Sequence, residues 1–237
     1  MNGNGGSNNM KKIGILGGMS YESTIKYYDL ILQKYYDRYH DYNYPEIIIY
    51  SLNFQKVIDY ELGDNESIYV NYLMTGINSL QNGGVDFILM AANSPHAVYN
   101  KLMQKTKVPI LSIVEVTAKK AQQENLKKLL LLGIKFTMRA SFYKETFSKF
   151  DMEVITPLDP EQDIINQIIF DELVIGKFTE ESKHKLLKII SNYNVDGVIL
   201  GCTELPLILQ QIDTNLRLLD TVELHIEAAL KYYLDQM

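Results

Sequence analysis

Cysteine occurs only once in this chain of 237 residues, as Cys202, and tryptophan does not occur at all. A single thiol excludes an internal disulfide, so we expect a reducing, cytoplasmic location. Basic side chains are outnumbered, with 23 Lys and Arg against 29 Asp and Glu. The resulting net charge of −6 argues against a nucleic-acid partner. Apolar runs stay short of the roughly 18 residues of a membrane helix, so we expect no membrane association.

Nucleotide and metal signatures are missing as well. The segment GILGG (14–18) lacks the GxGxxG spacing, and neither a phosphate loop nor a cluster at metal-ligand spacing is present. We therefore expect an activity without cofactor or metal. The opening segment MNGNGGSNN is rich in Gly and Asn, which predicts a disordered tail over residues 1–10.

Short apolar runs alternate with amphipathic segments through the rest of the chain. Continuous apolar runs of this length are typical of parallel strands that are buried on both faces. We expect strands within 12–18, 46–52, 85–91, 108–113, 128–134, 152–157, 195–201 and 216–220. Helical periodicity covers 21–39 and 64–84. This alternation predicts an α/β fold with open, mostly parallel sheets flanked by helices.

Two segments of the chain occur twice in the same order. VDFILMAANSPH (85–96) matches VDGVILGCTELP (195–206), and KKIGILGG (11–18) matches KKLLLLGI (127–134). The repetition predicts two pseudo-symmetric lobes with the functional site in the cleft between them. We expect lobe one to comprise 11–113 plus 215–237, returning as a strand and a last helix, and lobe two to comprise 114–214. Aligning the two copies places Ala92 at the position of Cys202.

Ligands of open α/β sheets bind beyond the carboxyl ends of the strands, where both of these residues are expected. Cys202 ends a strand at an expected helix start, which lowers a thiol's pKa and favours a catalytic role over that of a buried small side chain. His96 and His225 either exchange protons near neutral pH or orient loops. The candidate ligand-binding side chains are Met19, Asn53, Asn93, Ser94, Thr137, Thr203, Glu204 and His225, with Tyr21 and Ser141 as further candidates. The candidate cations for an acidic substrate are Lys177, Lys135 and Arg139.

Four motifs carry a resemblance to a known family. IGILGGMSYESTIKYY (13–28), AANSPH (91–96), GCTELP (201–206) and DTVELH (220–225) resemble motifs of the aspartate/glutamate racemase family, over residues 12–230. The resemblance implies racemisation of a small acidic amino acid, such as aspartate or glutamate, by two thiols that flank the α-carbon. It also implies that no pyridoxal phosphate is needed and that the protein is a homodimer. A dimer contact fits the tyrosines of 27–44, because tyrosine is enriched at interfaces.

The chain departs from that family where the first catalytic cysteine is expected. Ala92 stands there, and a methyl group cannot carry a proton; Ile134 stands where the resemblance leads us to expect threonine. We expect Cys202 to exchange the α-proton on one face, while water, His96 or a hydroxyl serves the other, or turnover is weak. Two alternatives are a single-cysteine decarboxylase of malonate-type acids from the same superfamily and a protein that binds an acidic amino acid without catalysis.

Overall fold

The fold consists of two parallel sheets, seen in a computed structural model that describes residues 11–234; the predicted tail over 1–10 lies outside this range. One sheet has the order β2-β1-β3-β4, from β1 (Ile13–Gly17), β2 (Ile47–Ser51), β3 (Phe87–Met90) and β4 (Ile110–Leu111). The other has the order β6-β5-β7-β8, from β5 (Lys128–Leu132), β6 (Glu153–Ile155), β7 (Gly197–Leu200) and β8 (Arg217–Asp220). Every pair of neighbouring strands in the two sheets is parallel, which confirms the predicted α/β fold of two lobes.

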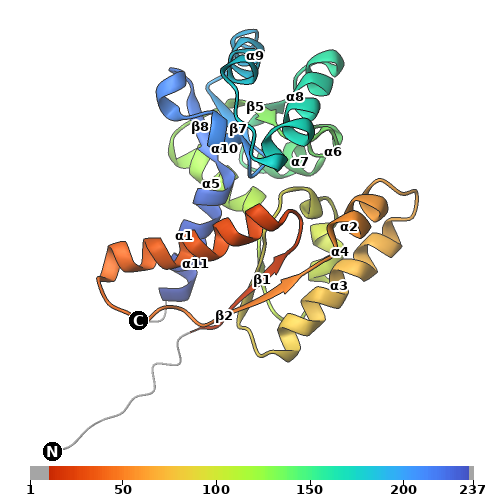
Figure 1. Ribbon diagram of the computed structural model, residues 1–237, viewed down its shortest axis with the longest axis vertical. Coiled ribbons are helices and arrows are strands. Elements are labelled where there is room, and N and C mark those ends of the chain that lie inside the picture. The colour runs from red at the N-terminus through yellow and green to blue at the C-terminus, as the bar shows by residue number, and fades with distance from the viewer. Residues whose placement is uncertain (1–10, 235–237) are drawn as a thin grey trace, which may run out of the picture.

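Helices flank both sheets, and the two lobes stand apart in Figure 1 with α5 and α11 where they meet. The first lobe carries α1 (Tyr21–Tyr39), α2 (Phe54–Glu61), α3 (Glu66–Asn82) and α4 (Tyr99–Met103). The second carries α6 (Lys135–Arg139), α7 (Phe142–Ser148), α8 (Asp159–Asp171), α9 (Glu180–Ser191) and α10 (Leu205–Ile208). The remaining helices are α5 (Ile113–Gln123) and α11 (Thr221–Leu234), with short 3-10 helices at Ser94–Val98, Leu173–Ile175 and Gln211–Asp213.

The two lobes exchange their last helices. Helix α5 follows a strand of the first sheet, yet its Ala118 shares a buried cluster with Leu131 of the second sheet. Helix α11 follows a strand of the second sheet, yet its Ile226 shares a buried cluster with Ile15 of the first. Strand β8 pairs with β7, so the prediction that the strand within 216–220 returns to lobe one is wrong. The helix that follows β8, α11, packs on the first sheet beside α1.

The turn between β1 and α1 brings the start of that helix against the strand end. Gly18 has a φ of +80°, and a Cβ at this residue would lie 2.2 Å from the carbonyl oxygen of Leu52. A Cβ at Gly17 would lie 2.4 Å from Cγ2 of Thr24. Both positions therefore need glycine for the chain to turn here. Ser20 then caps α1, its side chain accepting a hydrogen bond from the backbone N–H of Ser23.

Candidate active site

A cavity of about 280 Å³ lies between the two lobes, at the carboxyl ends of the strands. Strand β3 ends at Met90 and β7 at Leu200, so Ala92 and Cys202 both stand two residues past a strand end. The two strands also hold the same place in their sheets, and both residues line the cavity. The polar residues that line it are Ser20, Glu61, Asn93, Ser94, Lys135, Thr137, Asn166, Thr203 and Glu204. Its apolar lining includes Met19, Phe54, Val57, Ile58, Leu62, Ile134, Phe136, Ile169, Phe170 and Val174.

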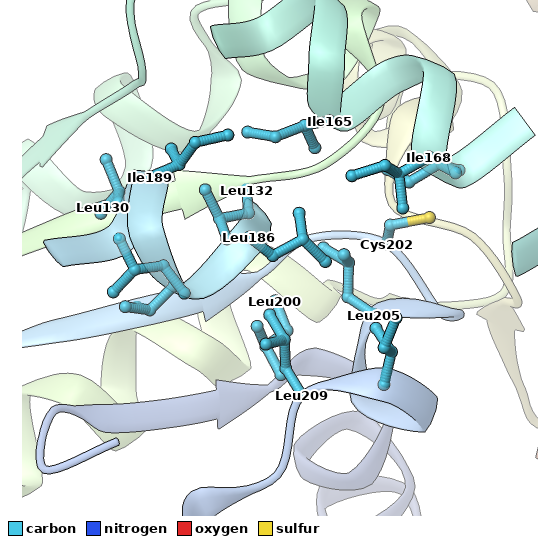
Figure 2. Close-up of a cluster of buried hydrophobic side chains, with 14 of the residues drawn as sticks. Leu130, Leu132, Ile165, Ile168, Leu186, Ile189, Leu200, Cys202, Leu205 and Leu209 are labelled. Atoms are coloured by element: carbon cyan, nitrogen blue, oxygen red, sulfur yellow. The ribbon is translucent and has the colours of Figure 1, made fainter. Parts of the chain in front are cut away.

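The thiol of Cys202 is buried beside a carboxylate. In Figure 2 its sulfur lies at the edge of the apolar cluster and points away from Leu132 and Leu186. The thiol donates a hydrogen bond to Oε2 of Glu204 over 3.0 Å. Burial, and then the negative charge of Glu204, raise the pKa of the Cys202 thiol well above its ordinary value. The expectation of a lowered pKa is therefore wrong, because the following helix is a single turn and its effect is outweighed.

The carboxylate of Glu204 accepts hydrogen bonds from both lobes. Thr203 donates to Oε2 over 2.6 Å, and Ser20 from the start of α1 donates to Oε1 over 3.0 Å. The hydroxyl of Ser23 lies 2.6 Å from that of Thr203 and extends the network across the lobe boundary. The sequence did not indicate Ser20 and Ser23 as site residues, although Ser20 is recognisable as a helix cap. This network fixes the direction of the Glu204 carboxylate toward the thiol.

Next to Ala92, the side chain of Asn93 is fixed by hydrogen bonds to residues outside the first sheet. Tyr143 of α7 donates to Oδ1 of Asn93 over 2.6 Å, and Nδ2 of Asn93 donates to Thr221 over 3.2 Å. An amide nitrogen carries two hydrogens, so one N–H of Asn93 is left for a ligand. Oγ1 of Thr137 is buried and has no hydrogen-bond partner among residues 11–234, although Thr137 lines the cavity. Both groups can therefore donate to a ligand without giving up an existing bond.

Glu61, the last residue of α2, lines the cavity on the first-lobe side and had not been recognised in the sequence. Tyr69 of α3 donates a hydrogen bond to Oε1 of Glu61 over 2.8 Å, and the Ser94 hydroxyl is hydrogen-bonded to the same carboxyl group. Burial raises the pKa of this carboxyl, against the lowering effect of the two hydroxyl groups. No motif marks Glu61, because it is brought to the site by the packing of α2 on α3.

The two buried histidines, His96 and His225, do not line the cavity, which favours the loop-orienting alternative over proton exchange with a ligand. His96 accepts a hydrogen bond from the N–H of Ile113 at Nε2, and its Nδ1 lies 3.2 Å from the carbonyl of Asn93. His225 bonds Tyr27 at Nδ1, over 2.8 Å, and the carbonyl of Leu111 at Nε2, over 3.1 Å. Burial lowers the pKa of His96 to about 4 and that of His225 to about 3. With both ring nitrogens occupied, these side chains hold the loops at the strand ends.

Several other residues that were predicted to bind a ligand also lie outside the cavity lining. Asn53 caps α2 with its side chain and does not line the cavity. The candidates Lys177, Arg139, Ser141 and Tyr21 do not line it either. Lys135 does, but its amino group forms an ion pair with Asp163. Of the residues the structure describes, no group of three or more His, Cys, Asp or Glu is arranged to hold a metal ion.

The chain matches the family model described as Asp/Glu/Hydantoin racemase over residues 16–229. It is 30% identical to the broad specificity amino-acid racemase RacX of Bacillus subtilis, over 94% of this chain and 98% of that protein. A solved aspartate racemase homologue from Pyrococcus horikoshii OT3 superposes with a TM-score of 0.83, at 36% identity, covering 94% and 99% of the two chains. The aspartate racemase of Picrophilus torridus gives a TM-score of 0.76 at 25% identity, covering 94% of each chain.

The chain therefore belongs to the Asp/Glu/hydantoin racemase family. The motifs that suggested this family lie at the cavity: the GGMS turn, the end of β3 and the end of β7. None of the helices within residues 11–234 is long and apolar enough to cross a membrane. The predicted homodimer stays a prediction; Tyr28, Tyr36, Tyr39, Tyr42 and Tyr44 have exposed side chains.

Proposed function

We propose that this protein is a cofactor-independent amino-acid racemase in which Cys202 exchanges the α-proton on one face of the substrate. One observation carries the proposal: Cys202 and Ala92 stand at equivalent strand ends of the two lobes, and both line one cavity. A planar carbanion held between them is open to proton transfer from either side. Such transfer at both faces interconverts the two enantiomers.

The thiol needs a base before it can accept a proton. Glu204, whose Oε2 is 3.0 Å from the sulfur, takes the thiol proton when substrate binds, and the thiolate then takes the α-proton. In the reverse direction the same thiol gives its proton to the carbanion and is reset by Glu204. The free N–H of Asn93 and the Thr137 hydroxyl bind the α-carboxylate of the substrate. Donors held in fixed positions stabilise the charge that develops there.

The side chain of the substrate is less restricted than the predicted aspartate or glutamate. An acidic side chain needs a free cation, yet among residues 11–234 Lys135 is the one basic residue that lines this cavity, and it is paired with Asp163. Glu61 adds negative charge to the same space, and Phe54, Ile169 and Phe170 supply apolar surface. This composition favours amino acids with uncharged side chains over acidic ones. The Bacillus relative is a broad specificity amino-acid racemase, which supports a substrate range that is not confined to aspartate and glutamate.

Chiral chromatography tests the proposal directly. The purified protein is incubated with each enantiomer of a panel of amino acids, in water and in D2O, beside Cys202→Ala. The parent should form the opposite enantiomer, and Cys202→Ala should lose this activity by roughly 10²–10⁴-fold, as expected for one positioned acid/base. Ligand-dependent thermal stabilisation should persist in the variant, because the groups that donate hydrogen bonds to the substrate's α-carboxylate remain. Dialysis against a chelator, or added pyridoxal phosphate, should leave the parent activity unchanged.

Other outcomes identify the alternatives. Release of carbon dioxide from a disubstituted malonate would indicate the single-cysteine decarboxylase. Thermal stabilisation by acidic amino acids without exchange of the α-proton would indicate a binding protein. Racemisation that Cys202→Ala leaves at the parental rate would show that the thiol is structural.

A further inference from the structure

We propose that the carboxyl group of Glu61 is the second acid/base of this site and serves the face of the substrate where Ala92 leaves no thiol. The inference rests on the proposed racemase function and goes beyond it by naming the group opposite Cys202. It concerns a side chain that lines the same cavity as both of those residues.

Glu61 lines the cavity from the first lobe, at the end of α2. Its carboxyl is hydrogen-bonded to the hydroxyl of Ser94, which is two residues beyond Ala92 on the same strand end. Tyr69 of α3 holds the other side of the group with a hydrogen bond of 2.8 Å. These two contacts place Glu61 beside position 92 in the first lobe, whereas Cys202 follows β7 in the second lobe. The alanine methyl leaves the space in which the α-carbon and a longer side chain can approach each other.

The chemistry of the two groups is complementary. A carboxyl that is partly buried, beside the apolar side chains of Phe54, Ile58 and Leu62, keeps its proton at higher pH than an exposed one. Such a group can give a proton to a carbanion and take one back. In one direction the Cys202 thiolate takes the α-proton, the C–H bond breaks, and Glu61 donates its proton to the opposite face. The sulfur is then a thiol again; Glu204 releases to solvent the proton that it took from the thiol at the start, and the Glu61 carboxylate regains one from solvent.

Each lobe thereby contributes one group that carries a proton: a thiol from the second lobe and a carboxyl from the first. On the second-lobe side a thiol is paired with a carboxylate that accepts from Thr203 and Ser20. On the first-lobe side a carboxyl takes hydrogen bonds from Ser94 and Tyr69. Asn93, between them, is anchored to Tyr143 and Thr221 and holds the substrate carboxylate. A cysteine at position 92 is then unnecessary.

Exchange in D2O separates the two faces. The parent should exchange the α-hydrogen of both enantiomers for deuterium and should interconvert the two enantiomers. Glu61→Gln should lose interconversion by roughly 10²–10⁴-fold while one enantiomer, whose α-hydrogen faces Cys202, still exchanges within a few-fold of the parental rate. Cys202→Ala should show the complementary pattern, retaining exchange only in the other enantiomer. Glu66→Gln is the matched control, since Glu66 is an exposed glutamate on α3 that does not line the cavity.

Two further variants keep the test decisive if Glu61→Gln folds poorly. Glu61→Asp retains a carboxyl on a shorter side chain and should slow interconversion more than it slows exchange at the Cys202 face. The double variant Ala92→Cys with Glu61→Gln places a thiol on the same face and should regain interconversion relative to Glu61→Gln.

The inference is overturned if Glu61→Gln interconverts enantiomers at the parental rate, or if it loses exchange in both enantiomers together. A double variant that binds substrate but stays as slow as Glu61→Gln also overturns it. A parent that neither interconverts nor exchanges any amino acid of the panel overturns the proposed function itself, and this inference with it. Failure of the inference alone is recognised by a parent that is active and insensitive to Glu61→Gln.

Discussion

The sulfur of Cys202 lies 3.0 Å from Oε2 of Glu204, and this carboxylate is in turn held by Thr203 and Ser20. The contact has two opposing effects on the thiol. It raises the thiol's pKa, because a thiolate next to a carboxylate is unfavourable, and it supplies a base that can receive the thiol proton. The resting thiol therefore keeps its proton, and in the proposed mechanism the reactive thiolate forms only during turnover.

Glu204→Gln should separate these two effects. The amide removes the negative charge, so the pKa of the Cys202 thiol should fall toward its ordinary value while α-proton exchange falls by roughly 10²-fold or more. Because the chain has a single cysteine, the thiolate absorbance and the rate of alkylation as functions of pH report on this one group. Glu153→Gln, at an exposed glutamate paired with Lys128, is the control and should change neither quantity. An unchanged or raised thiol pKa in Glu204→Gln would contradict the proposed role of the carboxylate.

The bond between Ser23 and Thr203 should contribute to the stability of the two-lobed arrangement. Both hydroxyls are buried and 2.6 Å apart, and Ser23→Ala removes this bond while Thr203 still donates to Glu204. Loss of one buried hydrogen bond costs about 0.5–1.5 kcal/mol of the free energy of unfolding, which urea denaturation measures. Ser148→Ala removes an exposed serine hydroxyl from α7 and should stay within about 0.5 kcal/mol of the parent. Equal effects of the two substitutions would show that the contact between lobes adds nothing.

The strands could be predicted from the sequence because their apolar runs are buried on both faces, which leaves a continuous signal. Each of the eight expected runs contains one strand, and the repeat correctly aligned Ala92 with Cys202. The predicted boundaries placed residues from 114 onward in lobe two and the last helix in lobe one, and α5 and α11 pack against those sheets. The strand within 216–220 was assigned to the wrong lobe, because an apolar run does not say which sheet the strand will join.

Site residues were predicted where a sequence motif follows a strand. They were missed where only the packing of helices places a residue at the cavity. Asn93, Ser94, Thr137, Thr203 and Glu204 line the cavity, whereas Glu61 reaches it from a helix without a recognisable motif. His96 and His225 are near the strand ends in sequence, but backbone groups and, at Nδ1 of His225, the Tyr27 hydroxyl occupy their ring nitrogens. The direction of the thiol's pKa shift depends on burial and on the orientation of the Glu204 carboxylate, which neighbouring residues in sequence do not determine.

The two buried histidines should make the protein less stable in mild acid. Burial lowers the pKa of His96 to about 4, and burial together with the charge of His96 lowers that of His225 to about 3. Both values lie below the ordinary value of about 6.5, so the unfolded chain binds protons that the folded chain does not. The free energy of unfolding should be highest above about pH 6.5 and should fall as the pH drops from there toward 4. The expected slope is up to about 1.4 kcal/mol per pH unit for each histidine.

Urea denaturation across this pH range measures the slope. His225→Gln should flatten it relative to the parent, because one of the two groups is removed, even though the variant is less stable throughout. His184→Gln, at an exposed histidine of α9, should leave the slope unchanged. A parent whose stability is independent of pH between 6.5 and 5, or a His225→Gln slope equal to that of the parent, would contradict the assignment of these histidines as buried and neutral.

The final prediction concerns substrate preference. The cavity wall from Phe54, Ile169 and Phe170 is apolar, and the single lining cation, Lys135, is already paired with Asp163. We therefore expect kcat/KM to be higher for amino acids with uncharged side chains, such as methionine and leucine, than for aspartate or glutamate, by at least about tenfold, or 1.4 kcal/mol. Lys135→Ala should leave this ranking in place, because the lysine does not supply a free charge. Initial rates of interconversion by chiral chromatography, with Lys144→Ala as a control at an exposed lysine of α7, give both comparisons. Preferred turnover of aspartate that Lys135→Ala abolishes, with methionine unaffected, would instead assign Lys135 to an acidic side chain and restore the acidic amino acid as the substrate.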